Sequence, residues 1–493
     1  MKKYTSIALL IALLSALAAC GEAGTAADTT AAAGDTTAAP VDQYPDDLPE
    51  DLDFGGEAVN FLYRAEVLSE FYADTSNGDV VNDALYNSIR SVEERLNVDI
   101  VAVPRDGHLV DARTEYMNHM NSTILAGDDA YDWVDLMIGN ASVQQKAGIF
   151  LDVAENKYID LEKPWYLADM VDEAGIDGKL YLISGDASLG YLKCTMALYF
   201  NTALVDVYKL ENPYKLVDEG KWTLDKVMEL TAIASQDVNA DGVYNEEDKI
   251  GYCIHDFNHR NGFGQSAGVE FFKTNADGTR TFSLGTEHDV DAAEKYYKLI
   301  KETPGAWFPN IANSRADDLE KYNQIAKKFA SGDIFLMTAE IDDAVMQLRD
   351  MNDPYGILPY PKLDETQKEY ISASRNTHNS FSMPVTCGDP DMAGAVMEAL
   401  AASNYEKVLP AYFEVALKTK YARDDDTARM YDLIRASTRL TFAYTYNNAI
   451  SSPISAFVSA TQSNNLASQV ASKKSAVDTS LASYYEEMRK LAE

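Results

Sequence analysis

An alternation of apolar strands and amphipathic helices begins at residue 57 and constrains the fold more than any other feature of this chain. Glu57–Tyr63, Val98–Val103 and Trp133–Ile138 have the composition of strands, and helical patterns cover 85–96 and 111–126 between them. Strands that alternate with helices predict a parallel sheet covered on both faces, with right-handed crossovers. The chain is therefore expected to belong to the α/β class.

Sheets of this kind bind ligands beyond the carboxyl ends of their strands, at the loops that follow. This rule singles out Asp106–His108 after the second strand and Gly139–Ser142 after the third. Both segments also fit ordinary turns.

Length and composition bound the class of protein. With 493 residues, of which 46% are hydrophobic, the chain is long enough for two or three domains with real cores. A formal net charge of −36 makes broad contact with phosphate backbones repulsive, so nucleic acid is not expected as a partner. Outside the leader, Cys194, Cys253 and Cys387 show no paired spacing, so neither a disulfide framework nor a zinc site is indicated.

The first twenty residues indicate the compartment. Lys2 and Lys3 precede an apolar run over 7–16, and Leu17-Ala18-Ala19-Cys20 resembles a bacterial lipobox. This resemblance implies that residues 1–20 are a signal peptide and that Cys20 is lipidated on the outer face of the cell membrane; the alternative is a plain signal peptide. The apolar run is shorter than the roughly 20 residues that a membrane-spanning helix needs.

A tether and a crossing between lobes are expected next. Residues 21–54 are rich in Ala, Thr, Asp, Gly and Pro, so they lack the apolar surface needed to fold. Further along, the apolar runs Leu180–Ile183 and Thr195–Phe200 flank a loop of small and polar residues, which predicts a passage between two lobes. An ordinary buried strand pair is the alternative. A second passage is expected over 355–361 followed by 372–380.

The most specific local motif is a twelve-residue loop over Asp237–Asp248. Oxygen-bearing side chains stand at positions 1, 3, 5, 9 and 12, with Gly242 at position 6, which is the spacing that wraps a hard cation. The loop resembles the calcium loop of dockerins, so a structural Ca²⁺ is expected; an acidic turn without metal is the alternative. The predicted ligands are Asp237, Asn239, Asp241, the Val243 carbonyl and Asp248, with Asn245 acting through water.

The order of several short motifs resembles the extracellular solute-binding proteins of ABC importers, in particular the sugar-binding group related to maltose-binding protein. The matching segments are the lipobox and tether, 94–98, 127–129 before 133–137, 178–181 leading to 198–201, 220–223, 330–333 and 356–361. The resemblance implies a two-lobed periplasmic-binding-protein-like fold, in which each lobe is a sheet flanked by helices and a ligand closes the hinge. It also implies permease subunits as partners. The calcium-type loop and the long helical C-terminus depart from the family pattern.

The same resemblance divides the chain and places its site. Lobe 1 is expected over 55–183 plus about 371–405, and lobe 2 over 184–370 plus about 406–493, with the ligand gripped between them. Sugars suit aromatic faces combined with carboxylate, amide and guanidinium groups. The candidates at the expected cleft are Asn140, Asp186, Tyr191, Trp307, Glu340, Asp342, Arg375, Asn376 and His378.

The alternatives to a receptor are a secreted carbohydrate-active enzyme and a calcium-dependent surface binding module. Gly264-Gln265-Ser266-Ala267-Gly268 matches the nucleophile-elbow pattern of hydrolases, but a polar segment precedes it where a buried strand is required. A calcium-dependent surface binding module is the third class, although a dockerin needs a duplicated loop and this chain has one. The sequence therefore predicts a carbohydrate-binding receptor and no enzyme.

Overall fold

Two larger sheets, each flanked by helices, form the body of the protein, and the first of them follows the predicted pattern. The computed structural model describes residues 45–167, 170–254, 257–309, 315–348, 351–413, 415 and 425–492. In the first sheet β1 (Glu57–Arg64) lies between and parallel to β2 (Val98–Arg105) and β3 (Trp133–Met137), while β11 (Asn379–Ser382) pairs antiparallel with β3. The parallel sheet predicted from the alternation is confirmed.

Helix α1 (Val80–Leu96) forms where the sequence pattern places it. The Asp79 carboxylate caps its first turn by accepting hydrogen bonds from the backbone of Val81 and Asn82 at 3.0 and 3.2 Å. Its buried face repeats every three or four residues, and Asn97 ends it in the left-handed conformation at φ 50°. The other helices around this sheet are α2 (Val110–Leu125), α3 (Ile138–Gln144), α4 (Met170–Ala174), α13 (Pro390–Pro410) and α15 (Phe442–Tyr446), with the 3-10 helices η1 (Ala65–Glu70) and η2 (Gln145–Ala147).

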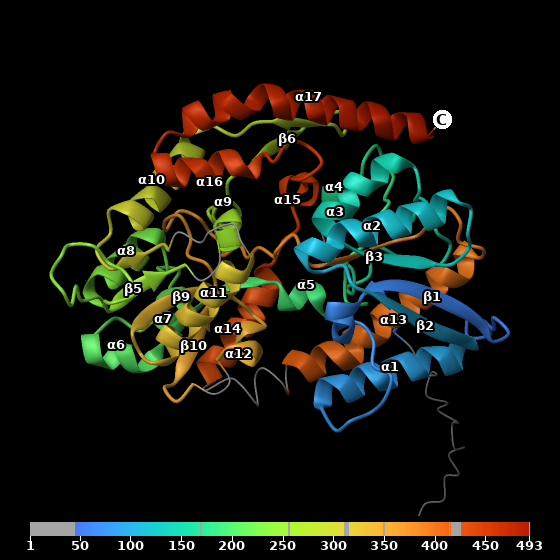
Figure 1. The fold of residues 1–493 in the computed structure, drawn as a ribbon, viewed down its shortest axis with the longest axis horizontal. Helices are drawn as coiled ribbons and strands as arrows, with labels where there is room; N and C mark the ends of the chain where they lie inside the picture. Colours follow the sequence, from blue (N-terminus) through green and yellow to red (C-terminus); the bar gives the residue numbers. More distant parts are fainter. Residues whose placement is uncertain are drawn as a thin grey trace, which may run out of the picture. The chain divides into compact units, whose positions relative to one another are not determined.

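The second sheet is mixed and has the order β10-β4-β9-β5-β8. Its strands are β4 (Met196–Asn201), β5 (Ile250–Cys253), β8 (Ala306–Trp307), β9 (Ile334–Glu340) and β10 (Tyr355–Leu358), with a separate hairpin of β6 (Phe272–Thr274) and β7 (Arg280–Phe282). Around it lie α6 (Thr202–Tyr208), α7 (Pro213–Asp218), α8 (Leu224–Ile233), η3 (Phe257–Asn261), α9 (Gly262–Ser266), α10 (Glu287–Lys301), α11 (Arg315–Ala330), α12 (Asp343–Met346), α14 (Asp425–Ser437) and α16 (Ile454–Ser463). Figure 1 shows the two sheets side by side, so the two-lobed α/β architecture is confirmed.

Three segments run side by side between the sheets, and we call them the crossing band: residues 194–196, 372–375 and 437–439. The first leaves the short helix α5 (Gly190–Lys193) and enters β4. Met196 N donates to Ala373 O at 2.8 Å, and Ser372 N donates to Ser437 O at 3.1 Å. The two passages predicted from the sequence therefore lie next to each other, and a third that was not predicted joins them. The apolar run Leu180–Ile183 forms no strand; within it only Ile183 makes an isolated bridge, with Phe381.

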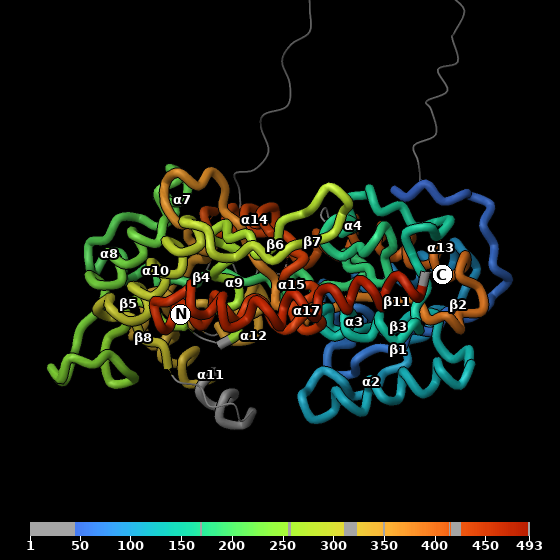
Figure 2. The backbone as a smooth tube through the Cα atoms, turned by 90° about the horizontal axis from the view of Figure 1, so that it is seen from above, coloured from blue at the N-terminus to red at the C-terminus, as the bar shows by residue number. Residues whose placement is uncertain are grey.

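The C-terminal helix α17 (Leu466–Ala492) contacts both halves of the structure. Its first turns pack on α16, whereas near its end the Tyr484 hydroxyl donates to Ser142 O at 2.7 Å, beside the first sheet. Arg489 pairs with Asp177 at 2.7 Å. In Figures 1 and 2 the helix runs from beside α16 towards the helices of the first sheet. This long helix therefore ties the two lobes together at a place remote in sequence from the crossing band.

The packed chain begins earlier than the predicted tether boundary at residue 54. Arg95 Nη1 pairs with Asp46 at 2.6 Å, and the Leu48 side chain is buried in the core. Residues 45–54 are thus held by an ion pair and an apolar anchor that the composition of the segment conceals. The predicted signal peptide, Cys20 and the rest of the tether lie outside the described residues. None of the described helices has the length and apolar character needed to cross a bilayer.

The ion pair between Arg64 and Asp135 gives a test of the fold. Both side chains are almost fully buried and their closest atoms are 2.7 Å apart, so Asp135→Ala leaves a guanidinium without its counter-charge. We expect this change to lower the free energy of unfolding by about 3–5 kcal/mol in urea denaturation. Lys490→Ala, which removes an exposed surface pair with Glu486, is the control and should change it by less than about 1 kcal/mol. Equal effects of the two changes would contradict the assignment.

Candidate functional site

Polar side chains from both sheets meet at the crossing band, and we call them the junction cluster: Arg64, His108, Asp135, His259, Glu340, Arg375, Asn376 and His378. Arg64 ends β1, and its Nε and Nη2 donate to the two carboxylate oxygens of Asp135 in β3 at 2.7 and 3.2 Å. Its remaining nitrogen, Nη1, donates to Thr377 O at 3.3 Å and faces His108 Nδ1 at 3.1 Å. One buried guanidinium thus links the first sheet to the segment that enters β11.

His108 lies in the loop after β2, one of the two loops that the strand-end rule singled out. Because a guanidinium only donates, the Nδ1 atom that faces Arg64 is the unprotonated nitrogen, and Nε2 carries the hydrogen. Burial, together with the positive charges of Arg64, Arg113 and Arg375, lowers the pKa of His108 to about 4. The imidazole is therefore neutral at physiological pH and offers a single N–H donor.

Glu340, at the end of β9, has side-chain neighbours from both the second lobe and the crossing band. Arg375 Nη1 donates to Glu340 Oε1 at 2.8 Å, and His259 Nε2 lies 3.4 Å from the same oxygen. The Glu340 and Arg375 side chains keep 16% and 24% of their surface exposed, so they remain reachable from solvent. Glu340 and Arg375 were predicted from the sequence, whereas His259 was not. His259 follows β5 in the second sheet, as His108 follows β2 in the first.

His378 and Asn376 complete the cluster. His378 Nδ1 donates to Arg375 O at 2.6 Å, and burial lowers the pKa of this imidazole to about 4. Its Nε2 is then a buried acceptor with no hydrogen-bond partner among the described residues. The Tyr191 ring meets the His378 ring edge-on, with centroids 5.0 Å apart. Gly139 N donates to Asn376 O at 3.3 Å, which places Asn140, in the first turn of α3, next to the cluster.

Three predicted residues lie elsewhere. Asp342 pairs with Lys193 at 3.3 Å and accepts a hydrogen bond from Tyr412 at 3.0 Å. Asp186 lines a cavity of about 350 Å³ together with Tyr191 and with Thr195 of the crossing band, and burial raises the pKa of its carboxyl to about 7. Trp307 lies half-buried on the edge strand β8.

The Ser266 motif lacks the geometry of a nucleophile elbow. The residue lies within α9, and its hydroxyl donates to Phe263 O at 3.0 Å and meets Tyr296 Oη at 2.9 Å. The serine is almost fully buried, whereas the elbow exposes its nucleophile on a tight turn between a strand and a helix.

The twelve-residue loop is closed by hydrogen bonds of its acidic residues. Asp237 Oδ2 accepts from Gly242 N at 2.8 Å, while Oδ1 of the same carboxylate is buried with no partner among the described residues. The two oxygens of Asp248 accept from Val238 N and Asn245 N, both at 2.9 Å. Within the described ranges, no group of three or more His, Cys, Asp or Glu side chains is gathered as a metal site. The other oxygen atoms of the loop that could bind a cation belong to the Asn239 and Asn245 side chains and the Val243 carbonyl.

The fold is similar to that of solved solute-binding proteins. One is the galacto-N-biose/lacto-N-biose I-binding protein of an ABC transporter from Bifidobacterium longum, in complex with lacto-N-biose, with 12% identity over 88% of this chain and 98% of that chain and a TM-score of 0.56. A sugar transporter protein from Rhizobium etli in an open conformation matches with 14% identity over 88% and 99% and a TM-score of 0.55. A cyclo/maltodextrin-binding protein complexed with maltotetraose matches with 13% identity over 87% and 96% and a TM-score of 0.53. No protein-family profile and no curated protein sequence matches this chain.

The imidazoles of the cluster give a test of its electrostatics. Because the folded pKa values of His108 and His378 lie near 4, both rings should stay neutral at pH 5, where a histidine of ordinary pKa, about 6.5, is mostly protonated. Folding therefore releases protons from these groups between pH 6.5 and 4, and the stability that they contribute is present above 6.5 and lost as the pH falls. Nitrogen-15 NMR of the imidazoles, assigned with His108→Gln and His378→Gln, measures both protonation and tautomer. Protonation of either ring at pH 6 would contradict the geometry.

Proposed function

We propose that this protein captures a carbohydrate between its two lobes and delivers it to the permease of an ABC importer. The observation that carries the proposal is the junction cluster, in which groups from both sheets and from the crossing band meet. A site built from two lobes binds fully only when both contribute, so ligand favours the arrangement in which the lobes are closest. The fold supports this proposal, because the solved proteins that share it are described as binding lacto-N-biose or maltotetraose.

The chemistry of the cluster suits hydroxyl groups better than ions. His108 is neutral and donates, the Glu340 carboxylate accepts, and the Asn376 amide does both. The charge of Arg375 is balanced by Glu340 at 2.8 Å, so the site has no strong net attraction for an anion or a cation. A sugar hydroxyl, which donates one hydrogen bond and accepts others, matches this set.

The remaining predicted candidates take secondary positions in this proposal. Asn140 and Tyr191 adjoin the cluster and are expected to contact the ligand. Three candidates lie apart from the cluster: Asp186, Asp342 and Trp307. Only a long oligosaccharide would reach them. Ser266, in the one motif that suggested hydrolysis, is buried within α9 and lacks the exposed elbow geometry of a nucleophile. This favours a binding role without catalysis at that motif.

The N-terminus supplies the other half of the proposal. The lipobox ending at Cys20 supports attachment to the outer face of the cell membrane by a lipid, and the following polar residues support a flexible link to the folded body. The partners are then the membrane, through the lipid, and the permease subunits, through the two lobes. Metabolic labelling with a fatty acid, with Cys20→Ala as the control, tests the anchor; labelling that survives this change would refute it.

Ligand binding is tested with a panel of neutral oligosaccharides that includes lacto-N-biose and maltotetraose. We expect at least one to raise the melting temperature and to bind saturably in calorimetry without being consumed. Glu340→Gln removes one charged hydrogen-bond partner, worth about 1.5–3 kcal/mol, so the Kd should rise about tenfold to a hundredfold. Lys490→Ala, on the exposed face of α17, is the matched control and should leave the Kd unchanged. Turnover of the sugar, or an unchanged Kd in the Glu340 variant, would overturn the proposal.

The loop over 237–248 is proposed to hold a structural Ca²⁺. Asp237, Asn239, Asp241, the Val243 carbonyl, Asn245 and Asp248 would hold the ion, and the buried, unpartnered Asp237 Oδ1 supports this fit. A bound Ca²⁺ would supply a positive charge at the centre of a loop that is otherwise acidic. Its expected role is to fix the connection between α8 and β5 rather than to take part in sugar binding.

Calcium binding is tested by comparing melting curves in Ca²⁺ and in chelator. At a free Ca²⁺ concentration a hundred times the Kd, stabilisation of about 2.7 kcal/mol is expected. Asp237→Asn keeps an oxygen for Gly242 N–H and should abolish the Ca²⁺ effect while changing the melting point in chelator little. Asp277→Asn, in the acidic turn of the β6–β7 hairpin, is the matched control and should retain the effect. Identical curves for the unaltered protein in both buffers would exclude the site.

A further inference from the structure

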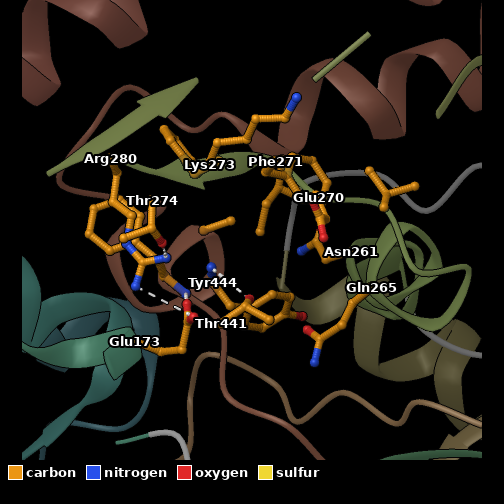
Figure 3. A pocket seen from close by; sticks show the side chains of 15 residues that line it. Glu173, Asn261, Gln265, Glu270, Phe271, Lys273, Thr274, Arg280, Thr441 and Tyr444 are labelled. Carbon is orange, nitrogen blue, oxygen red and sulfur yellow. Dashed lines mark hydrogen bonds and ion pairs between the residues drawn. The ribbon is translucent and has the colours of Figure 1, made fainter. Parts of the chain in front are cut away.

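A pocket of about 490 Å³ lies between the β6–β7 hairpin, α9 and α15, and we call it the hairpin pocket. Its volume falls within the range of about 300–1,000 Å³ that small-molecule sites occupy. In Figure 3, Asn261 and Gln265 reach in from one side, Arg280 and Thr274 from the opposite side, and Thr441 and Tyr444 lie between them. None of these residues belongs to the junction cluster.

Gln265 is the fixed polar group of this pocket. Its side chain is 6% exposed, and Nε2 donates to Arg439 O at 2.7 Å and to Ser372 O at 3.4 Å, both in the crossing band. These two carbonyls fix the orientation of the amide, so Oε1 is the atom that faces the pocket. Among the described residues nothing donates to this oxygen, which makes it an oriented acceptor for a ligand.

Asn261 adds a second amide. Its side chain makes no hydrogen bond to any residue in the described part of the chain, and in Figure 3 it points into the same space as Gln265. An amide both donates and accepts, so the two side chains together match a group with neighbouring hydroxyls.

The charges of the hairpin pocket are balanced. Two acidic and two basic residues line it, and Arg280 lies 3.5 Å from Glu173 of α4, so that pair closes one wall. Arg280 also stacks over the Phe442 ring at 5.3 Å. Phe271 and Phe442 supply apolar surface beside the amides. Charge balance disfavours ions, and amides beside aromatic faces suit a ring that carries both C–H and O–H groups.

We propose that the hairpin pocket is a second binding site, separate from the junction cluster, for a small neutral polyhydroxy molecule such as a single sugar ring. Glu173 belongs to the side of the first sheet, whereas the hairpin and α9 belong to the second, so an occupant contacts both lobes. Gln265 donates to Ser372 O in the crossing band. A molecule bound to Gln265 is therefore connected to the segment 372–375, which carries Arg375.

The site is tested with D-glucose, D-galactose and myo-inositol, and with D-glucuronate as a charged probe, by ligand-observed NMR and calorimetry. At least one neutral probe should bind, and Asn261→Leu should weaken its binding at least tenfold, because the substitution removes an amide that supports no other described contact. Gln265→Met should act in the same direction. Lys298→Ala, which removes an exposed surface pair with Glu294 on α10 and does not line the pocket, is the matched control.

Glu340→Gln separates this proposal from the proposed function of the junction cluster. Binding of the neutral probe should persist in Glu340→Gln, while oligosaccharide binding at the junction is weakened. Saturation by none of the neutral probes, loss of binding in Glu340→Gln to the same degree as in Asn261→Leu, or tighter binding of glucuronate would each overturn the proposal.

Discussion

The arrangement of the first lobe depends on one buried ion pair, between Arg64 and Asp135. Removing two charges from water is costly unless every donor and acceptor finds a partner. Here Asp135 accepts from Arg64 through two nitrogens and from Asn379 Nδ2 at 2.8 Å, while the third guanidinium nitrogen serves Thr377 O and His108. The pair therefore joins β1, β3 and β11 and fixes the tautomer of a histidine at the sheet edge. Because every polar atom of this buried ion pair needs a partner, the pair fixes the positions of the residues around it at the sheet edge.

Two structural ties hold the lobes together, and they are of different kinds. The crossing band joins them through backbone hydrogen bonds such as Met196 N to Ala373 O. Helix α17 joins them through side chains, with Tyr484 donating to Ser142 O and Arg489 paired with Asp177. Any change in the angle between the lobes would therefore have to break these side-chain contacts or carry them along.

The polar groups around the crossing band are largely neutral or paired with an opposite charge. Burial keeps the His108 and His378 imidazoles uncharged, and Glu340 balances Arg375. The hairpin pocket repeats the pattern with Arg280 and Glu173. In the proposed function, the hydroxyl groups of a ligand match these neutral donors and acceptors. The crossing band supports both the junction cluster, through Arg375, and the hairpin pocket, through Gln265.

The sequence by itself determined the class of the fold, because strand and helix periodicities are local: the parallel order of β1–β3, the end of α1 at Asn97 and the passage into β4 all follow from short patterns. It also pointed to the loops near His108 and Gly139, since a parallel sheet places its strand ends together. Only the tertiary structure decided that Glu340, Arg375 and His259 meet while Asp186, Asp342 and Trp307 lie apart. It likewise revealed the packed segment over 45–54 and the contacts of α17 with both lobes. The reason is physical: periodicity records which face of an element is buried, whereas the pairing of charges far apart in the chain depends on distances that exist only after the sheets have packed.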